Sequence, residues 1–312
     1  SLFIVPKFFV NDDGSLGDRN DVKCIGLEDK LGIHASPTCV MSFGENDGAT
    51  GWLIGAENTG MAAMFTMMNN ARLNVGIQGV GLAEQATQIA MSYASDRIQG
   101  RAPDAQKGDN TPVAIASHPD VRNMLMTMRA LTDAARAICY ENGVFHDLAH
   151  FSGDEKAKAF NELLTPISKA FSTDIANEVS SLGVQIHGGM GFVEETGIAQ
   201  FARDAKILPI YEGTNGIQAI DLINRKLPLA NGAIISEYLD QIEETIIQCA
   251  REETLKELSS ALKNGLADLR VATDFMLTHP DKLDRLYGAT DYLTLFGLVA
   301  GGHYLARGAL GT

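Results

Sequence analysis

Glu212 is the residue whose position in the sequence best suits acid–base chemistry. It lies between Tyr211 and Gly213, on a short connection that follows Pro209. Because proline lacks the backbone N–H that a helix requires, the amphipathic turn over residues 201–207 is expected to end before it. A carboxylate on a loop held between rigid elements can act as a general base. On residue type alone, however, a loop acid is more often simply exposed to water.

A helix is expected directly after this connection. Thr214 or Asn215 can serve as its N-cap, since short polar side chains accept a hydrogen bond from the first turn of a helix. Isoleucines then recur at every third position from Ile217 to Ile223. Glu212 is therefore placed on a tight link between two helices, just ahead of the second one.

Two longer strings indicate which chemistry this is. Residues 211–218, Y-E-G-T-N-G-I-Q, closely resemble the Y-E-G-T-x-x-I-Q signature of the acyl-CoA dehydrogenase family. Residues 185–192, Q-I-H-G-G-M-G-F, resemble the family's Q-x-x-G-G-x-G-F flavin-contact motif. An unrelated helical bundle would have to match both motifs, in the family's order, by chance.

The resemblance implies the α,β-desaturation of an acyl-CoA thioester, with FAD as cofactor. Glu212 matches the base that removes the α-proton while the β-hydrogen leaves as hydride to the flavin. The thioester oxygen would accept hydrogen bonds from the Glu212 backbone N–H and from a flavin hydroxyl. Some family members carry the base at the position matching Ala71, but alanine cannot accept a proton, which leaves Glu212.

The resemblance also implies binding residues. Those that match FAD contacts are Arg97, Gln99, His118, Gln185, His187, Gly188, Gly189, Thr214, Asn215 and Gly216. Those that match acyl-CoA contacts are Asn69, Asn70, Arg72 and Gly213. Residues 185–189 match a segment that reaches the FAD of a neighbouring subunit, which implies a homodimer or homotetramer. Simpler interpretations stay open, namely a surface arginine at position 97, a helix-start histidine at 118 and a helix C-cap at 188–189.

Some features of the family are missing. Residues 97–100, R-I-Q-G, lack the phenylalanine that usually precedes the glycine. The family more often has an acid at the position of Asn69. A T-E-P-x-A-G-S-type flavin segment and the family's N-terminal helical domain have no counterpart in the sequence. We therefore expect the chain to be a fragment of a longer FAD enzyme and to be inactive by itself.

The elements that must position these residues are mainly helical. Apolar residues recur at spacings of three and four over residues 61–97, which predicts a long helix. Gly76, Gly79 and Gly81 lie inside it and indicate close packing or ligand approach, because glycine disfavours a helix. Further helices are predicted over residues 119–150, 155–187, 214–226, 236–266, 269–277 and 282–310. Apolar runs predict strands at residues 2–5, 38–43 and 51–54.

The expected fold class is mainly α. It is the family's C-terminal four-helix up-down bundle, preceded by part of a β-barrel-like domain and followed by extra helices. We expect the end of the middle β-domain at residues 1–55, the bundle at 56–228 and an additional helical domain at 229–312. That last segment resembles a larger bacterial subgroup, which includes enzymes for long-chain and sulfur-containing acyl-CoAs such as methylmercaptopropionyl-CoA dehydrogenases.

Composition narrows the class of protein further. The 312 residues carry a net charge of −14, which argues against binding to nucleic acid or to an anionic membrane. The four cysteines form no C-x-x-C pair, so they indicate neither a zinc site nor a disulfide framework. No apolar run is long enough to span a membrane, and the first residues lack the features of a signal peptide. We expect a bacterial cytoplasmic protein that binds no metal.

The implied electron acceptor is an electron-transfer flavoprotein, and two alternatives stay open. An acyl-CoA oxidase would use the same base and fold but pass the electrons to O₂. A relative that keeps the fold only for a binding role would not desaturate anything. The intact string around Glu212 argues against this second alternative.

Overall fold

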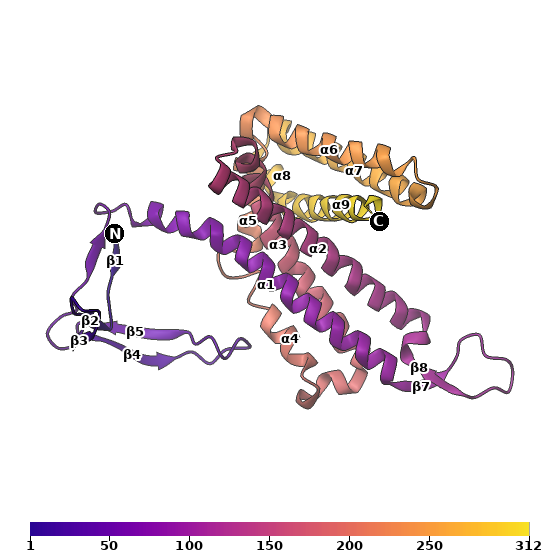
Figure 1. Cartoon of the computed structure of the whole chain (residues 1–312), viewed down its shortest axis with the longest axis horizontal. Helices are drawn as coiled ribbons and strands as arrows, with labels where there is room; N and C mark the ends of the chain where they lie inside the picture. Colours follow the sequence, from indigo (N-terminus) through magenta and orange to yellow (C-terminus); the bar gives the residue numbers. More distant parts are fainter. Residues whose placement is uncertain (312) are drawn as a thin grey trace. The chain divides into compact units, whose positions relative to one another are not determined.

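The computed structural model describes residues 1–311, apart from the side chains of Thr66 and Asn69. The chain divides into two compact units, Ser1–Asn70 and the chain from Ala71 onward. The first unit contains three pairs of strands and the start of a helix, and the second is mostly helical (Figure 1). Helix α1 (Gly60–Asp96) contributes residues to both units.

The strands of the first unit pair antiparallel, two by two. The pairs are β1 (Leu2–Ile4) with β6 (Trp52–Ile54), β2 (Phe8–Val10) with β3 (Leu16–Arg19), and β4 (Val22–Leu27) with β5 (Cys39–Phe43). The buried Asn20 ties these segments together, because its amide donates to the Pro6 and Thr50 carbonyls at 3.0 and 2.8 Å. The predicted strands β1, β5 and β6 are confirmed. Glycine and charged residues interrupt β3 and β4, so the apolar pattern does not predict them.

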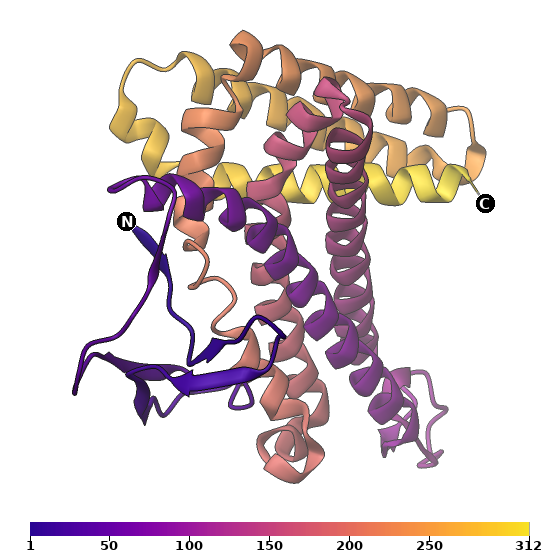
Figure 2. The same ribbon diagram turned by 60° about the vertical axis from the view of Figure 1, so that its left-hand side comes forward.

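Two long helices form the centre of the second unit, α2 (Pro119–Ser152) and α3 (Glu155–His187) (Figures 1 and 2). Gly153 ends α2 with φ 64°, a left-handed conformation that glycine adopts readily. The Asp154 carboxylate then caps α3 by accepting hydrogen bonds of 2.9 and 3.0 Å from its first backbone N–H groups. These terminal signals explain why the predicted bounds of α3 agree with the structure.

Shorter elements complete this part of the second unit. A small hairpin of β7 (Ile98–Arg101) and β8 (Pro112–Ala114) lies between α1 and α2 in the chain. After α3 come α4 (Ile198–Ala205) and α5 (Asn215–Asp221), and α5 continues as a π-helical turn to Lys226. Both α4 and α5 pack against α3. The connection between α4 and α5 carries Glu212.

Helix α1 packs tightly against α3 at two of its glycines. A methyl group added at Gly76 would lie 2.5 Å from the Ser168 carbonyl oxygen, and one at Gly79 would lie 2.7 Å from that of Ser172. Both distances are too short for a carbon–oxygen contact, so a residue without a side chain is required at each position. Gly81 has no such neighbour within 4 Å. The predicted close packing is therefore confirmed for Gly76 and Gly79 but not for Gly81.

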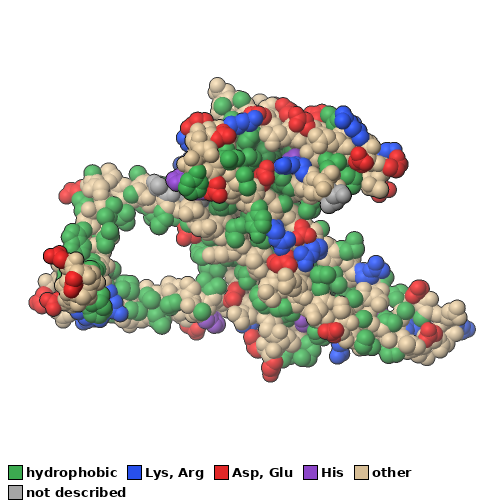
Figure 3. All heavy atoms as spheres, viewed as in Figure 1, with side chains coloured by type: hydrophobic (Ala, Val, Ile, Leu, Met, Phe, Trp, Pro, Cys, Tyr) green, Lys and Arg blue, Asp and Glu red, His purple; other side chains and the backbone are tan. Residues whose placement is uncertain are grey.

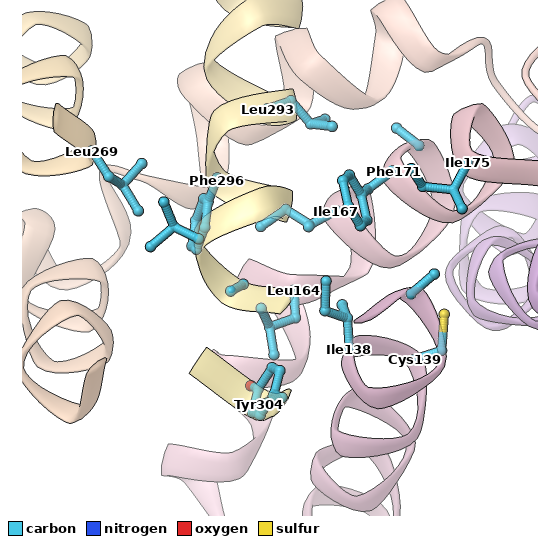
Figure 4. Packing of buried hydrophobic residues seen from close by; sticks show 14 of the residues in the cluster. Ile138, Cys139, Leu164, Ile167, Phe171, Ile175, Leu269, Leu293, Phe296 and Tyr304 are labelled. Carbon is cyan, nitrogen blue, oxygen red and sulfur yellow. The ribbon is translucent and has the colours of Figure 1, made fainter. Parts of the chain in front are cut away.

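The rest of the second unit is a layer of helices. Its members are α6 (Ala233–Cys249), α7 (Lys256–Thr278), α8 (Lys282–Tyr287) and α9 (Ala289–Leu310). Helix α9 packs against α2, α3, α6 and α7. Figure 4 shows how Phe296 and Leu293 of α9 meet Ile167 and Phe171 of α3, with Leu269 of α7 on the other side. This apolar core joins the layer to α2 and α3.

The single helix predicted over residues 236–266 is wrong. The structure has α6 and α7 there, joined by a reversal at residues 250–255. No glycine or proline marks this reversal in the sequence. Tertiary packing stabilises it instead, since α6 and α7 lie side by side and the Ser259 hydroxyl of α7 donates to the Ile246 carbonyl of α6 at 2.9 Å.

Charged side chains of both signs are interspersed over the helices on the face shown in Figure 3. Arg270 of α7 pairs with Asp240 and Glu243 of α6 at 2.9 and 2.8 Å.

Within residues 1–311, no helix is both long and apolar enough to cross a membrane. In the same range, no three His, Cys, Asp or Glu side chains lie where they could share a metal ion.

His303 of α9 gives stability a specific pH dependence. Its ring is 2% exposed, and its Nδ1 has no hydrogen-bond partner among the described residues. Burial, together with the nearby Arg307, lowers the pKa of His303 from 6.5 to about 4. Between pH 6.5 and pH 4, His303 is therefore protonated in the unfolded chain but stays neutral in the folded chain.

We expect acidification through this window to remove roughly 3 kcal/mol of folding free energy through His303 alone. The His303→Phe variant should lose this component, because phenylalanine does not titrate. Urea unfolding of both proteins at pH 7 and pH 4.5 gives the difference directly. If the free energy of unfolding falls by the same amount between pH 7 and pH 4.5 in wild type and in the variant, the assignment to His303 is contradicted.

Candidate functional site

Glu212 occupies a strained position in the connection between α4 and α5. Its φ is 55° and that of Gly213 is 82°, so two successive residues are left-handed. For a residue other than glycine this conformation costs about 1–2 kcal/mol, and such strain persists where the surroundings impose it. The Asn215 N–H closes the turn by donating to the Pro209 carbonyl at 3.0 Å. The half-buried Glu212 is thus presented by a turn of fixed shape.

The side chain of Asn215 fastens this turn to α3. Its amide group donates to Asp174 Oδ1 at 2.7 Å and to Thr173 Oγ1 at 2.9 Å. Its Oδ1 accepts a hydrogen bond of 2.9 Å from Lys169 Nζ. On the other side of Glu212, the Tyr211 hydroxyl donates to Gln78 of α1. The turn that carries Glu212 is therefore anchored on two helices.

A second polar group lies behind the turn. Arg72 of α1 and Asp221 of α5 form an ion pair of 3.3 Å in which the side chains are only 10% and 9% exposed. The fully buried Gln218 donates to the Gly213 carbonyl at 3.2 Å. Arg72 Nε and Gln218 Oε1 have no partner among the described residues. These two buried atoms leave one donor and one acceptor for a ligand or for water.

Burial also shifts acid–base equilibria around the turn. It lowers the pKa of Lys169 to about 8, although the nearby Asp174 carboxylate opposes the shift. It raises the pKa of Asp174, which the hydrogen bond from Asn215 partly offsets. It raises the pKa of Tyr211 as well, and the charge of Glu212 adds to that effect.

Two segments that are far apart in sequence, at Arg97 and at His187–Gly189, meet at a separate pocket. This pocket has a volume of about 540 Å³, and the side chains or backbone of Arg97, Gln99, His187, Gly188 and Gly189 line it. Five residues expected to contact FAD are thus brought together. Among the described residues the guanidinium of Arg97 has no ion-pair or hydrogen-bond partner. A free guanidinium suits a phosphate, which it can bind in bidentate fashion.

His187 is held rigidly at the edge of this pocket. Its ring stacks on Tyr93 with centroids 4.1 Å apart, and its Nδ1–H donates to the Gly183 carbonyl at 2.7 Å. Gly188 follows with φ 61° and ψ −137°, a conformation essentially restricted to glycine. A methyl group at Gly191 would lie 2.3 Å from the Val184 carbonyl oxygen. The glycines therefore end α3 and turn the chain sharply beside the pocket.

The remaining predicted residues lie at several places. His118 donates from Nε2 to the Gln99 carbonyl at 2.8 Å, so it joins the start of α2 to β7. Thr214 is the N-cap of α5, with its hydroxyl accepting from Ile217 N at 3.3 Å. Exposed positions are occupied by Asn70, Gln185 and Gly216. The side chain of Asn69 lies outside the described part of the chain, and an acyl-CoA contact by the buried, paired Arg72 stays a prediction.

Sequence reasoning did not point to Lys169 or Asp174, and it gave Gln218 no role of its own. Lys169 and Asp174 contact the turn only because α3 packs beside it, whereas Gln218 closes the 211–218 string and donates back to Gly213. The one available signal was a lysine within the helical run 160–176, whose other residues are largely apolar or small. Such a lysine is unusual on a buried helix face.

Comparison with known proteins identifies relatives for most of the chain. Residues 58–227 match the family described as "Acyl-CoA dehydrogenase, C-terminal domain", and residues 238–311 match "Acetyl-CoA dehydrogenase C-terminal like". The chain is 45% identical to the 3-methylmercaptopropionyl-CoA dehydrogenase of Ruegeria pomeroyi, over 99% of the chain and 53% of that protein. It is 37% identical to a butyryl-CoA dehydrogenase of Syntrophomonas wolfei, over 87% of the chain and 47% of that protein. The chain spans about half the length of these curated relatives.

Solved structures share the fold. The ACDH-11 protein of Caenorhabditis elegans, in complex with C11-CoA, has a TM-score of 0.79 at 21% identity, over 98% of the chain and 52% of that protein. An acyl-CoA dehydrogenase of Bacillus anthracis, complexed with FAD, has a TM-score of 0.72 at 22% identity, over 98% of the chain and 53% of that protein. The butyryl-CoA dehydrogenase of Megasphaera elsdenii has a TM-score of 0.50 at 27% identity, over 65% of the chain and 48% of that protein.

Proposed function

The chain belongs to the acyl-CoA dehydrogenase family, and on that premise we propose that the full-length protein uses FAD to desaturate an acyl-CoA thioester between its α and β carbons. The observation that carries this proposal is the setting of Glu212. Its carboxylate lies on a left-handed turn that is anchored to α1 through Tyr211 and to α3 through Asn215. A base held in this way can meet a C–H bond without reorganising its surroundings.

In this mechanism Glu212 removes the proton from the α-carbon. FAD, when bound, supplies the acceptor for the hydride that leaves the β-carbon. Negative charge then develops on the thioester oxygen, which requires a hydrogen-bond donor. The backbone N–H of Glu212 donates no hydrogen bond within residues 1–311, so it is free for this role. The chain can thus supply both the base and one oxyanion donor from a single residue.

The pocket at Arg97 is the proposed site for the phosphate portion of FAD. Its free guanidinium, the rigid ring of His187 and the backbone of Gly188 and Gly189 fit an anionic, hydrogen-bonding ligand. The sequence match of residues 185–189 supports a homodimer or homotetramer in which this segment serves a neighbour's cofactor. We likewise keep residues 56–228 as the catalytic bundle and 229–312 as an additional helical domain.

Replacing Arg97 by methionine is expected to weaken FAD binding about ten- to hundredfold, which corresponds to the loss of one charge-assisted hydrogen-bonded contact. Methionine keeps the length of the side chain but removes the charge. Fluorescence titration of the FAD-stripped full-length protein measures the dissociation constant. Arg251→Met, at an exposed residue of the α6–α7 reversal, is the matched control and should bind FAD like wild type. Equal FAD affinity in all three proteins would place the phosphate site elsewhere.

The function itself is tested with a panel of thioesters. The full-length protein is incubated with methylmercaptopropionyl-, butyryl- and long-chain acyl-CoAs plus an artificial electron acceptor, and the products are weighed by mass spectrometry. Loss of two hydrogens from one class of thioester supports desaturation and names the acyl class. No mass change with any thioester would contradict it. Rapid O₂ consumption without an added acceptor would identify an oxidase, whereas its absence supports an electron-transfer flavoprotein as the partner.

A further inference from the structure

Lys169 is the most unusual side chain near the turn that carries Glu212. It lies on α3 and has no exposed surface. Lysine is almost never fully buried unless its charge is paired and hydrogen-bonded. Its one hydrogen bond to a side chain among the described residues goes from Nζ to Asn215 Oδ1, at 2.9 Å. That acceptor is neutral, so the hydrogen bond alone does not explain a buried cation.

The charges that act on Lys169 come from its own helix, from the turn and from α1. On its own helix, Asp174 attracts the ammonium, and on the turn Glu212 does the same. Arg72 of α1 repels it, but Asp221 of α5 pairs with Arg72 at 3.3 Å. The Arg72 charge is thereby largely balanced by its own partner. Asp174 and Glu212 are left as the carboxylates that the Lys169 ammonium faces.

Asn215 links Lys169 mechanically to the same turn. Its Oδ1 accepts from Lys169, its Nδ2 donates to Asp174, and its backbone N–H closes the turn on Pro209. Lys169, Thr173 and Asp174 of α3 thus all hydrogen-bond the Asn215 side chain, and Lys169 is the cation of this network. Loss of the lysine would leave Asn215 Oδ1 with the longer 3.2 Å bond from Thr173.

We propose that Lys169 is a positioning residue for the proposed reaction: through Asn215 it fixes the shape of the turn at residues 209–215, and its ammonium charge attracts the Glu212 carboxylate and so helps to hold it in place for proton removal. The part that concerns proton removal rests on the proposed function. The part that concerns the shape of the turn does not, so the two can be tested separately. If Lys169 served only to pair with Asp174 within α3, its replacement would leave the shape of the turn unchanged.

The titration of Lys169 gives the proposal a signature in the wild-type protein. Because its pKa is about 8 in the folded chain, the ammonium charge is lost as the pH rises through 8. We expect kcat/KM for the thioester to fall above pH 8, since this parameter reports groups of the free enzyme. The fall should disappear in Lys169→Met, which has a similar length and no charge.

Hydrogen exchange tests, without any enzymatic activity, whether Lys169 fixes the turn at residues 209–215 through Asn215. We call this role the clamp. In the full-length protein, amide exchange of the peptide covering residues 209–215 should become at least about tenfold faster in Lys169→Met than in wild type, because the buried anchor of the turn is removed. Lys206→Met, at an exposed lysine just before the turn, is the matched control and should exchange like wild type. Lys169→Gln, which can still donate to Asn215 without a charge, should restore slow exchange but not the wild-type pH profile.

The outcomes separate the two proposals. Faster exchange in Lys169→Met supports the clamp even if no thioester is desaturated, in which case the proposed function fails and the clamp stands. Wild-type exchange in Lys169→Met overturns the clamp. Wild-type kcat/KM with no change through pH 8, in an active enzyme, overturns the role of the charge. If Lys169→Met does not fold, the wild-type pH profile and the Lys169→Gln exchange rate decide.

Discussion

Replacing Glu212 by glutamine is expected to slow the reduction of the bound flavin by acyl-CoA about 10³-fold or more, within the range that one general base contributes. Glutamine keeps the size and the left-handed turn, but its amide cannot take the α-proton. Binding of the thioester should change little, because the oxyanion donor assigned to residue 212 is a backbone N–H. Stopped-flow mixing without O₂ measures the rate, and a binding titration measures the affinity.

Two further variants make this result specific. Glu212→Asp keeps the charge but withdraws the carboxylate by one carbon, so we expect an intermediate rate. Glu195→Gln removes an exposed acid from the preceding connection and should react like wild type. A Glu212→Gln protein that reduces its flavin at the wild-type rate would mean that another residue removes the proton.

Placing a single methyl group at Gly79 is expected to destabilise the helical unit by about 2–3 kcal/mol, in the range of overpacking a dense interior. The added carbon would lie 2.7 Å from the Ser172 carbonyl oxygen, a backbone atom that cannot turn away. For a unit of this size the loss corresponds to a fall in Tm of about 2–4 °C per kcal/mol. Gly76→Ala, at 2.5 Å from Ser168, should behave alike.

Gly81→Ala is the matched control on the same helix. It has no neighbour within 4 Å, so only the higher helix propensity of alanine acts there. We expect it to be neutral or stabilising by up to about 1 kcal/mol. Thermal unfolding of the three variants side by side decides the matter. Equal Tm values for Gly79→Ala and Gly81→Ala would contradict the close packing of α1 against α3.

The sequence predicts most of the helical fold because its signals are local. Capping at Asp154 and a left-handed glycine at 153 define where α3 begins, and Thr214 defines where α5 begins. The reversal between α6 and α7 has no such local signal, and it depends on contacts like that of Ser259 with Ile246. For this reason the prediction from the sequence merges these two helices into one.

The candidate site follows the same division. Glu212 can be recognised from the sequence because Pro209 closely precedes it and Gly213 directly follows it. The partners that fasten its turn, Lys169 and Asp174, come from a helix 38–43 positions earlier and meet it only through packing. The gathering of Arg97 and His187 in one pocket likewise requires α1 and α3 to lie together. No local sequence pattern indicates which residues from distant helices will come into contact.

The most direct test of Glu212-driven desaturation uses an acyl-CoA deuterated at its α-carbon, mixed with the full-length wild-type protein and with Glu212→Gln in the absence of O₂. We predict that the wild-type flavin bleaches, more slowly than with the undeuterated thioester, and that the α,β-unsaturated product has lost one deuterium. The Glu212→Gln flavin should stay oxidised. Equal bleaching in both proteins, or a bound flavin that no thioester bleaches, would contradict the role of Glu212.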